Sequence, residues 1–303
     1  MVVTYNSAAT IVGLLDSLDR QGDALNQVVI RDNGSVDDTL QRVQDRAHSL
    51  RLPVVVQAGS NLGFAGGVAA ALDYLDATDA RPVLVVNPDV RLADGSVGRM
   101  LDVMRTLSRT GVVTAPLVRT DGSVDTASRR RLPTLINSGL YAVLGRLTPA
   151  RVRYNAVSNS PPTERIGDVG FSSIEATTGA LMLVNPDFRD AKSGIFDQDY
   201  WMYGEDLQLC HDARDEGWGV IMAEIDPSLH FKGVSSGLPR NRTSDQAFHR
   251  ALYLYYRKNL RRNRVESVLV ALAIAMRYLF SRLMARCSEC REAAGRVRAG
   301  RAR

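Results

Sequence analysis

One candidate for chemistry in this sequence is the motif Asn87-Pro88-Asp89, which closes the apolar run from Val83 to Val86. A carboxylate that follows four apolar strand residues must project past the sheet, where it meets water or a cation. Mg²⁺ is usually held in this way, by one or two carboxylates together with substrate phosphates. Asp89 is therefore a candidate metal ligand, and an ordinary turn after a strand is the structural alternative.

A second candidate is the pair Glu205-Asp206, which follows three aromatic residues and a glycine between Tyr200 and Gly204. Two acids at the start of a helix often do no more than stabilise the helix dipole. The aromatic surroundings make that explanation less complete, because a carboxylate in a partly apolar pocket is a plausible general base. Asp206 and Glu205 are therefore candidate catalytic residues.

Three further segments carry weaker signals. The run Asp32-Asn33-Gly34-Ser35 has the residues of a turn and helix cap, although Asp32 could instead accept a hydrogen bond from a nucleotide base. The glycines of the segment 61–67 precede a predicted helix and would let backbone amides approach an anion, but they match neither a dinucleotide fingerprint nor a Walker loop. His230 follows the last predicted strand, and a lone histidine is more often structural than a ligand.

The elements that must position these residues alternate between short β-rich runs and helical patterns. This alternation predicts an α/β fold with a mostly parallel central sheet flanked by helices. In open α/β sheets ligands bind beyond the carboxyl ends of the strands, which is where every candidate lies. The predicted strands are 2–5, 27–31, 53–57, 82–87, 112–117, 179–184 and 219–225, and the predicted helices are 9–20, 35–50, 66–75 and 205–216. Residues 119–170 are predicted to be a variable loop region.

Composition narrows the class of protein. The chain has 303 residues, 45% of them apolar, which is enough for a sizeable core. It has no low-complexity tract or short repeat, which argues against disordered, collagen-like and solenoid proteins. Three cysteines and no signal-peptide pattern favour the reducing cytoplasm. Cys287 and Cys290 have C-x-x-C spacing without a second ligand pair, so a zinc site is not favoured.

The C-terminal segment 257–303 has a charge of its own. It holds 13 Lys and Arg against 3 Asp and Glu, so its net charge is +10, while the preceding residues sum to −5. A basic terminal segment suits an anionic lipid surface better than nucleic acid, and no nucleic-acid partner is predicted. The longest apolar run, residues 268–276, is shorter than the roughly 18 residues that a membrane span needs, so no transmembrane anchor is predicted.

Leucine and methionine residues in this segment recur at steps of three and four, which predicts an amphipathic helix with one apolar stripe. The stripe must be buried somewhere: against the preceding part of the chain, in a homodimer, or peripherally on the inner face of the plasma membrane. Its members are Leu269, Leu272, Met276, Leu279 and Leu283.

Taken together and in order, these motifs resemble the family 2 inverting glycosyltransferases of the GT-A fold, in particular the rhamnosyltransferase-like branch. The likeness spans residues 2 to about 235. It implies a catalytic domain over residues 1–240 and a basic helical tail over 241–303. The motifs that carry it are Val3-Thr4-Tyr5-Asn6, Asp32-Asn33-Gly34-Ser35, Asn61-x-Gly63-Phe64-Ala65-Gly66-Gly67, Asn87-Pro88-Asp89, Thr178-Gly179-Ala180 and the block from Phe196-Asp197 to Glu205-Asp206.

The resemblance assigns roles to residues of this chain. Asp89 would bind Mg²⁺ or Mn²⁺, with His230 as a further ligand, and Asp206 would be the catalytic base beside Glu205. The residues that would bind the nucleotide sugar are Thr4, Tyr5, Asn6, Asp32, Asn33, Asn61, Gly63, Phe64, Gly67 and Asn87. The donor would be a nucleotide-diphosphate sugar, dTDP-rhamnose by family likeness, and the acceptor a glycan or a polyprenyl-linked sugar of the cell envelope.

Asn87 stands where the stricter metal motif has Asp, and the first strand is short. Both departures leave open a nucleotide-sugar-binding or assembly protein that has lost catalysis. A nucleotidyltransferase is a second alternative, but it would need a glycine-rich basic loop after the first strand, where this chain has Asn6-Ser7-Ala8-Ala9.

Overall fold

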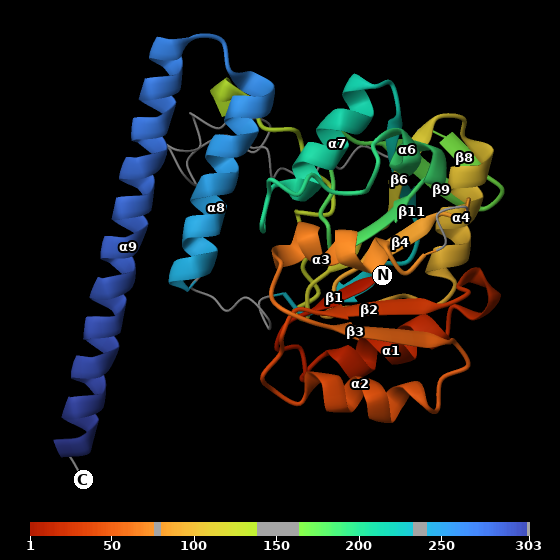
Figure 1. The fold of residues 1–303 in the computed structure, drawn as a ribbon, viewed down its shortest axis with the longest axis horizontal. Coiled ribbons are helices and arrows are strands. Elements are labelled where there is room, and N and C mark those ends of the chain that lie inside the picture. Colours follow the sequence, from red (N-terminus) through yellow and green to blue (C-terminus); the bar gives the residue numbers. More distant parts are fainter. Residues whose placement is uncertain (76–79, 138–163, 233–240, 302–303) are drawn as a thin grey trace. The chain divides into compact units, whose positions relative to one another are not determined.

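The computed structural model describes residues 1–75, 80–137, 164–232 and 241–301, with side chains as far as Ala285. The chain divides into two compact units (Figure 1). The larger unit comprises residues 1–201 and 205–235, and the smaller unit comprises residues 202–204 and 236–303. The domain boundary expected at residue 240 stays a prediction.

The described part of the larger unit contains three sheets. A parallel sheet has the order β1-β2-β3, a six-stranded sheet has the order β4-β10-β6-β11-β9-β8, and a small sheet has the order β5-β12-β7. The strands are β1 Val2–Thr4, β2 Val28–Asp32, β3 Val54–Ala58, β4 Val83–Val86, β5 Val90–Arg91, β6 Thr110–Thr114, β7 Leu117–Val118, β8 Glu164–Ile166, β9 Val169–Ser173, β10 Leu181–Val184, β11 Gly219–Glu224 and β12 Ser228–His230.

The predicted α/β class is confirmed, and the strand directions add a detail. Parallel pairing holds within β1-β2-β3 and between β6 and β11, whereas β10 runs antiparallel to both β4 and β6. An antiparallel neighbour needs no crossover helix, and the sequence predicted none before β10. The Met1 backbone continues the first sheet onto the second, because its amino group donates to the Leu84 carbonyl and its carbonyl accepts from the Val86 amide.

Two hydrophobic clusters cover the two faces of the first and second sheets, which Met1 joins. Successive side chains of a strand point to opposite faces, so Val2 belongs to one cluster and Val3 to the other. In β4 the same alternation sends Leu84 and Val86 to the first cluster and Val83 and Val85 to the second. Helices α1 and α4 contribute to the first cluster and α3 and α7 to the second, which gives the layered arrangement of helices around strands (Figure 1). The bounds of these helices are α1 Ile11–Asp19, α2 Thr39–Ala47, α3 Gly63–Leu72, α4 Ser96–Thr106, α6 Pro186–Ala191 and α7 Glu205–Asp215.

Two helices begin at other residues than the sequence predicted. The helix expected from Ser35 begins at Thr39, because the Ser35 hydroxyl and amide both bond to Asp32 rather than capping a helix. The helix expected from Gly66 begins at Gly63, three residues earlier. The loop region predicted over 119–170 contains β8 and the start of β9, while its part 138–163 lies outside the described residues.

The smaller unit is a pair of helices, α8 Arg242–Tyr255 and α9 Arg264–Arg301, joined through a π-helical turn at Tyr256–Leu260. The Ser281 hydroxyl donates to Asp245, and the Tyr278 ring meets His249 edge to face. These contacts hold one face of α9 against α8. The side chains of Cys287 and Cys290 lie outside the described residues.

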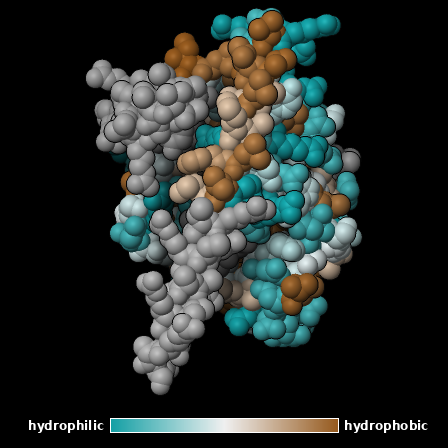
Figure 2. Space-filling model, turned by 90° about the vertical axis from the view of Figure 1, so that its left-hand side faces the viewer, coloured by the Kyte–Doolittle hydropathy of each residue, from teal (hydrophilic) through white to brown (hydrophobic). Residues whose placement is uncertain are grey.

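The predicted apolar stripe of α9 is exposed to solvent in this structure, and its burial against the larger unit, in a homodimer or on a membrane stays a prediction. Its five members are 55% to 66% exposed. Apolar side chains run along this helix in Figure 2. The stretch Arg264–Ala285 is also long and apolar enough, by length and composition, to cross a membrane, because only Arg277 and Arg282 interrupt its central part. The expectation that the chain has no transmembrane anchor stays a prediction.

Candidate active site

Asp89 and His230 are brought together by the small sheet. Asp89 follows β4 and precedes β5, and His230 ends β12, which pairs with β5 so that His230 faces Val90. The Phe231 amide donates to the Asp89 carbonyl over 2.8 Å. As a result the His230 Nε2 atom lies 3.5 Å from Asp89 Oδ1, and both side chains are buried.

The other imidazole nitrogen of His230 contacts Asp125, a residue that the sequence did not suggest. His230 Nδ1 lies 2.8 Å from Asp125 Oδ2, and Asp125 is completely buried. Burial alone would lower the pKa of His230, but the hydrogen bonds to Asp125 and Asp89 raise it to about 9. Burial would raise the pKa of Asp125, yet His230 and Lys232 together hold it well below its usual value.

The donor set on this side fits a divalent cation bound with a phosphate ligand. No group of three metal-ligating side chains occurs among the described residues, so the protein offers Asp89 and His230. One carboxylate with substrate phosphates is a common arrangement for Mg²⁺, and an imidazole whose other nitrogen bonds a carboxylate is a common metal ligand. The Asp125 contact leaves Nε2 as the nitrogen directed at Asp89.

Asp206 lies in the first turn of α7, and both of its carboxylate oxygens accept hydrogen bonds. Its Oδ2 atom accepts from the Arg130 guanidinium over 2.6 Å and from the Gly179 amide over 3.1 Å. Its Oδ1 atom accepts from the Leu207 amide. Arg130 also donates to the Thr177 carbonyl, so the ion pair is fixed from both sides. Arg130 lies in the predicted loop region, and the run of three arginines was its only sequence signal.

The segment Gly179-Ala180 joins the Asp89 side of the site to the Asp206 side. The Asn87 amide donates to the Ala180 carbonyl over 3.0 Å, and the Gly179 amide donates to Asp206. These residues precede β10, which runs antiparallel to β4, so they lie at the edge of the sheet where β4 ends. The loop that carries Asp89 and the helix start that carries Asp206 therefore meet at one edge of the sheet.

Glu205 has a different environment from its neighbour. Its side chain is buried, and its Oε2 atom has no hydrogen-bond partner among the residues that the structure describes. Burial, and then the charge of Asp206, raise the pKa of Glu205 to about 8. A carboxyl group with this pKa is mostly protonated at neutral pH and is a poor proton acceptor there. Of the two candidate catalytic acids, Asp206 is thus the one available as a base.

The candidate nucleotide side is built around Asp32, which is fully buried at the end of β2. Its Oδ1 atom accepts from the Thr4 and Ser35 hydroxyls, and its Oδ2 atom accepts from the Gly34 and Ser35 amides. This is the turn that the sequence offered as the alternative, without the helix cap at Ser35. Asp32 thereby fixes the loop, while the Tyr5 side chain next to Thr4 is exposed.

Asn6 and Asn33 tie neighbouring loops to this turn. Asn6 is in the left-handed region at φ 49°, and its Oδ1 atom accepts from the Val36 amide. Asn33 is buried and donates to the Gly63 carbonyl over 2.8 Å, while its Oδ1 atom has no hydrogen-bond partner in the described part of the chain. The two asparagines therefore hold the loops in place, and only Tyr5 among the neighbouring candidates is well exposed.

The segment from Asn61 to Gly67 serves mainly to bring elements together. Asn61 accepts from the Gly63 amide, and the Phe64 amide donates to the Trp201 carbonyl. A Cβ atom on Gly179 would lie 3.1 Å from the Phe64 ring, so Phe64 lies beside the Asp206 segment. A Cβ atom on Gly67 would meet Val3 and Asn33, so this glycine allows close packing. Gly67 thus has a packing role in this structure.

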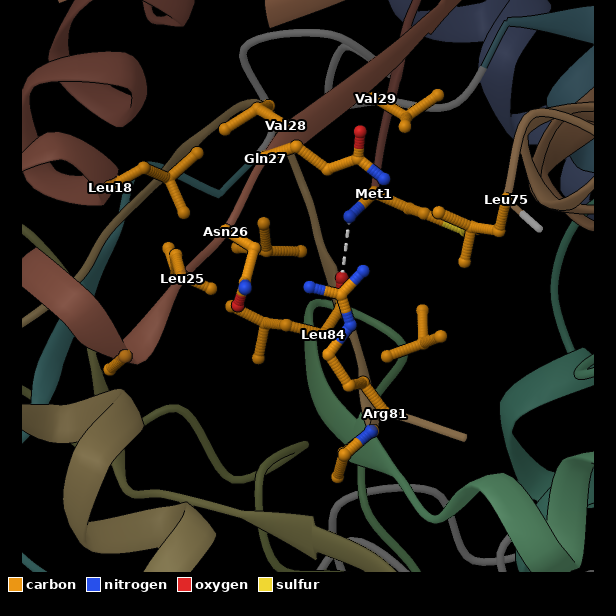
Figure 3. Close-up of a pocket in the computed structure, with 14 residues that line it drawn as sticks. Met1, Leu18, Leu25, Asn26, Gln27, Val28, Val29, Leu75, Arg81 and Leu84 are labelled. Atoms are coloured by element: carbon orange, nitrogen blue, oxygen red, sulfur yellow. Dashed lines mark hydrogen bonds between the residues drawn. The ribbon is translucent and has the colours of Figure 1, made fainter. Parts of the chain in front are cut away.

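A separate pocket of about 90 Å³ lies at the other ends of the strands (Figure 3). Met1, Val28 and Arg81 line it, and the Met1 amine points at the Leu84 carbonyl. Burial lowers the pKa of this amine to about 5. The pocket is at the start of β2 and β4, whereas the candidate site residues follow the ends of these strands. It is therefore not part of the candidate active site.

Comparisons with known proteins agree with this geometry. A sequence model of glycosyl transferase family 2 matches residues 1–167. The N-acetylglucosaminyl-diphospho-decaprenol L-rhamnosyltransferase of Mycobacterium tuberculosis is 33% identical over 269 residues, which cover 84% of this chain and 82% of the relative.

Solved structures share the fold at low sequence identity. The mannosyltransferase PcManGT from Pyrobaculum calidifontis, in complex with GDP-Man and Mn²⁺, has a TM-score of 0.53 at 15% identity and covers 97% of this chain and 74% of its own. S. aureus TarS 1-349 in complex with UDP-GlcNAc has a TM-score of 0.55 at 16% identity, over 89% of this chain and 69% of its own. The family match and the M. tuberculosis relative confirm the resemblance inferred from the motifs, and the chain belongs to glycosyltransferase family 2, with the GT-A fold.

Proposed function

We propose that this glycosyltransferase moves a rhamnosyl residue from dTDP-rhamnose to a hydroxyl group of a lipid-linked sugar, with inversion at the anomeric carbon and with a divalent cation. The M. tuberculosis relative supports the sugar and the acceptor, because its name describes rhamnosyl transfer to a decaprenol-linked N-acetylglucosamine. The observation that carries the chemistry is the meeting of the Asp89 loop and Asp206 at Gly179-Ala180.

Asp206 would take the proton from the acceptor hydroxyl as that oxygen attacks the sugar. The Arg130 and Gly179 donors fix Oδ2, so the carboxylate has one orientation before substrate arrives. Glu205 remains protonated beside it and adds no second negative charge at neutral pH. A base on one side of the sugar and a departing diphosphate on the other give a single displacement with inversion.

Asp89 and the Nε2 atom of His230 would hold Mg²⁺ or Mn²⁺ on the donor side. When bound, such a cation supplies positive charge that stabilises the leaving diphosphate. Asn87 supplies no second carboxylate. Its backbone N–H donates to the Ala180 carbonyl, so it would hold the Asp89 loop in place. The exposed ring of Tyr5 at the end of β1 is the side chain offered for contact with the base.

The experiment that tests this proposal measures transfer from dTDP-rhamnose to a polyprenyl-diphospho-N-acetylglucosamine and compares the chain with Asp206→Asn. We expect the substitution to reduce turnover by about 10²- to 10⁴-fold, the usual contribution of a general base. Affinity for dTDP-rhamnose, measured by calorimetry, should stay within a few-fold of the parent value. Retention of most activity would remove Asp206 as the base.

The released nucleotide separates the alternatives. Transfer releases dTDP and gives a product whose anomeric configuration is opposite to that of the donor. A nucleotidyltransferase would release pyrophosphate, and a binding or assembly protein would release neither. Retention of the donor configuration in the product would contradict inversion while leaving sugar transfer intact.

The exposed face of α9 supports the proposal that the protein is cytoplasmic and attached peripherally to the inner face of the plasma membrane. Apolar side chains line this face, and residues 257–264 add five Lys and Arg next to it. Apolar burial together with basic residues is how amphipathic helices bind anionic bilayers. An attached enzyme would meet a lipid-linked acceptor in two dimensions rather than from solution.

A further inference from the structure

We propose that Asp125 is a positioning residue for the metal site: its buried carboxylate holds the His230 imidazole by Nδ1, so that Nε2 faces the cation held with Asp89. The inference rests on the proposed function, because it requires that Asp89 and His230 bind a cation. Asp125 lies shortly after β7, in a segment that the sequence identified only as a loop.

The geometry leaves the imidazole one arrangement. An imidazole has two nitrogens on opposite sides of its ring, and a partner at one of them determines which proton form the other presents. Asp125 Oδ2 is 2.8 Å from Nδ1, and Asp89 Oδ1 is 3.5 Å from Nε2. A bound cation would take the place of the Nε2 proton; the ring, then neutral with its remaining proton held at Nδ1 by Asp125, would direct the Nε2 lone pair at the cation on the Asp89 side, as in carboxylate–histidine–metal triads.

The second oxygen of Asp125 is held by other groups, which fixes the carboxylate itself. Oδ1 accepts from the Lys232 ammonium over 2.9 Å and from the Ala127 amide over 3.2 Å, and Arg119 lies 3.8 Å away. These two cations balance the buried negative charge. Oδ2 is therefore left for His230, and the carboxylate has partners of its own besides the imidazole.

The backbone of Asp125 is also anchored to the sheet that carries His230. Its amide donates to the Leu117 carbonyl in β7, and β7 pairs in parallel with β12. Asp125 is thus tied to the strand that pairs with the His230 strand, although 105 residues separate the two side chains in sequence. A buried acid that only stabilised the loop would not need the alignment of Oδ2 with the His230 Nδ1 atom.

The test measures the Mn²⁺ affinity of the full-length protein by electron paramagnetic resonance, with saturating dTDP and in a parallel series with UDP. We expect Asp125→Ala to weaken Mn²⁺ binding about 10- to 100-fold, the usual effect of losing such a partner. Asp125→Asn should recover most of this loss, because its amide oxygen still accepts from Nδ1. Asp121→Ala is the matched control, an exposed acid of the same loop that bonds to Ser123 within its own turn, and it should bind Mn²⁺ like the parent.

A double-mutant cycle distinguishes positioning from a general structural effect. If Asp125 acts through His230, Asp125→Ala should add almost nothing to the loss already caused by His230→Ala. Losses that multiply in the double variant, or parent-like affinity of Asp125→Ala, would overturn the inference. If Asp125→Ala does not fold, ¹⁵N spectra of the parent with Mg²⁺ and dTDP decide: a proton on Nδ1 is expected, and a proton on Nε2 overturns it.

The Asp89→Ala variant separates this inference from the proposed function. If Asp89→Ala and His230→Ala lose Mn²⁺ affinity while Asp125→Ala does not, only the role of Asp125 is wrong. If neither Asp89→Ala nor His230→Ala changes Mn²⁺ affinity, the proposed metal site is wrong. The positioning role of Asp125 is then wrong as well.

Discussion

Asp206 and Glu205 are neighbours in the chain but face different environments. Asp206 accepts hydrogen bonds from Arg130, Gly179 and Leu207, whereas Glu205 is buried and one of its oxygens lacks a hydrogen-bond partner within the described ranges. Pairs of acids whose surroundings separate their pKa values are common where one is to act as a base and the other to stay neutral. The contrast favours Asp206 as the base and Glu205 as a neutral neighbour. Their adjacent positions in the sequence could not distinguish these two roles.

The raised pKa of Glu205 predicts how stability depends on pH. Its carboxyl loses its proton near pH 4.5 in the unfolded chain but only near pH 8 in the folded protein. Between these values the unfolded state binds fewer protons, so stability falls as pH rises, and the deficit persists above pH 8. Glu205→Gln removes the buried acid and should raise Tm at pH 8 by several °C, with little difference at pH 4.

Calorimetric melting of the parent and of Glu205→Gln from pH 4 to pH 8.5 measures this. Glu164→Gln is a matched control, because Glu164 is exposed in β8. A Tm difference that does not grow between pH 4.5 and pH 8 would mean that Glu205 is ionised in the folded protein.

At the scale of elements, the start of α3 determines how the Asn61 loop meets the Asp206 segment. Gly63 has φ +75°, and a Cβ atom there would lie 1.9 Å from the Trp201 carbonyl oxygen. The Phe64 amide bonds that same carbonyl. Gly63 therefore permits both the turn into the helix and the contact with the segment before α7.

Gly63→Ala should destabilise the protein more than the left-handed conformation alone explains. That conformation costs a non-glycine residue about 1–2 kcal/mol, and the clash with Trp201 adds to it. Gly22→Ala is the control, since Gly22 has φ +58° but open space around its Cβ position. Denaturant unfolding should show a larger loss for Gly63→Ala, together with reduced transfer activity, and equal losses for both variants would show that the contact with Trp201 relaxes freely.

At the scale of the whole molecule, the charge asymmetry and the exposed face of α9 predict membrane attachment. Leu272→Ser with Leu279→Ser should greatly reduce flotation of the full chain with vesicles that contain phosphatidylglycerol. The control pair Tyr74→Ser with Ile136→Ser changes exposed apolar residues of the larger unit and should float like the parent. Vesicles of phosphatidylcholine alone should bind the parent weakly, because the basic residues then have no anionic partner.

Alkaline carbonate distinguishes the forms of attachment. A peripheral protein is released, whereas resistance to extraction would mean that Arg264–Ala285 spans the bilayer, as its length and composition allow. Equal flotation of the parent and the α9 variant would remove the membrane role of this face. Light scattering then tests the predicted homodimer as the alternative that covers it.

Local patterns along the chain were enough to predict the layered α/β class and the family. The alternation of apolar residues in strands and their recurrence in helices depend on near neighbours alone, so they can be read from short stretches of sequence. The ordered motifs predicted glycosyltransferase family 2, and they predicted that Asp89 and Asp206 lie beyond the carboxyl ends of the strands.

Contacts between distant parts of the folded chain determine which side chains of the site bond to one another. Asp125 meets His230 across 105 residues, and Arg130 meets Asp206 across 76. Both partners lie in a segment without periodicity, so no local pattern could mark them. The pairing of β7 with β12 brings Asp125 to His230, and strand order of this kind is a property of the whole fold. The exposure of the α9 stripe has the same origin, because periodicity predicts an apolar face but only packing determines whether another element covers it.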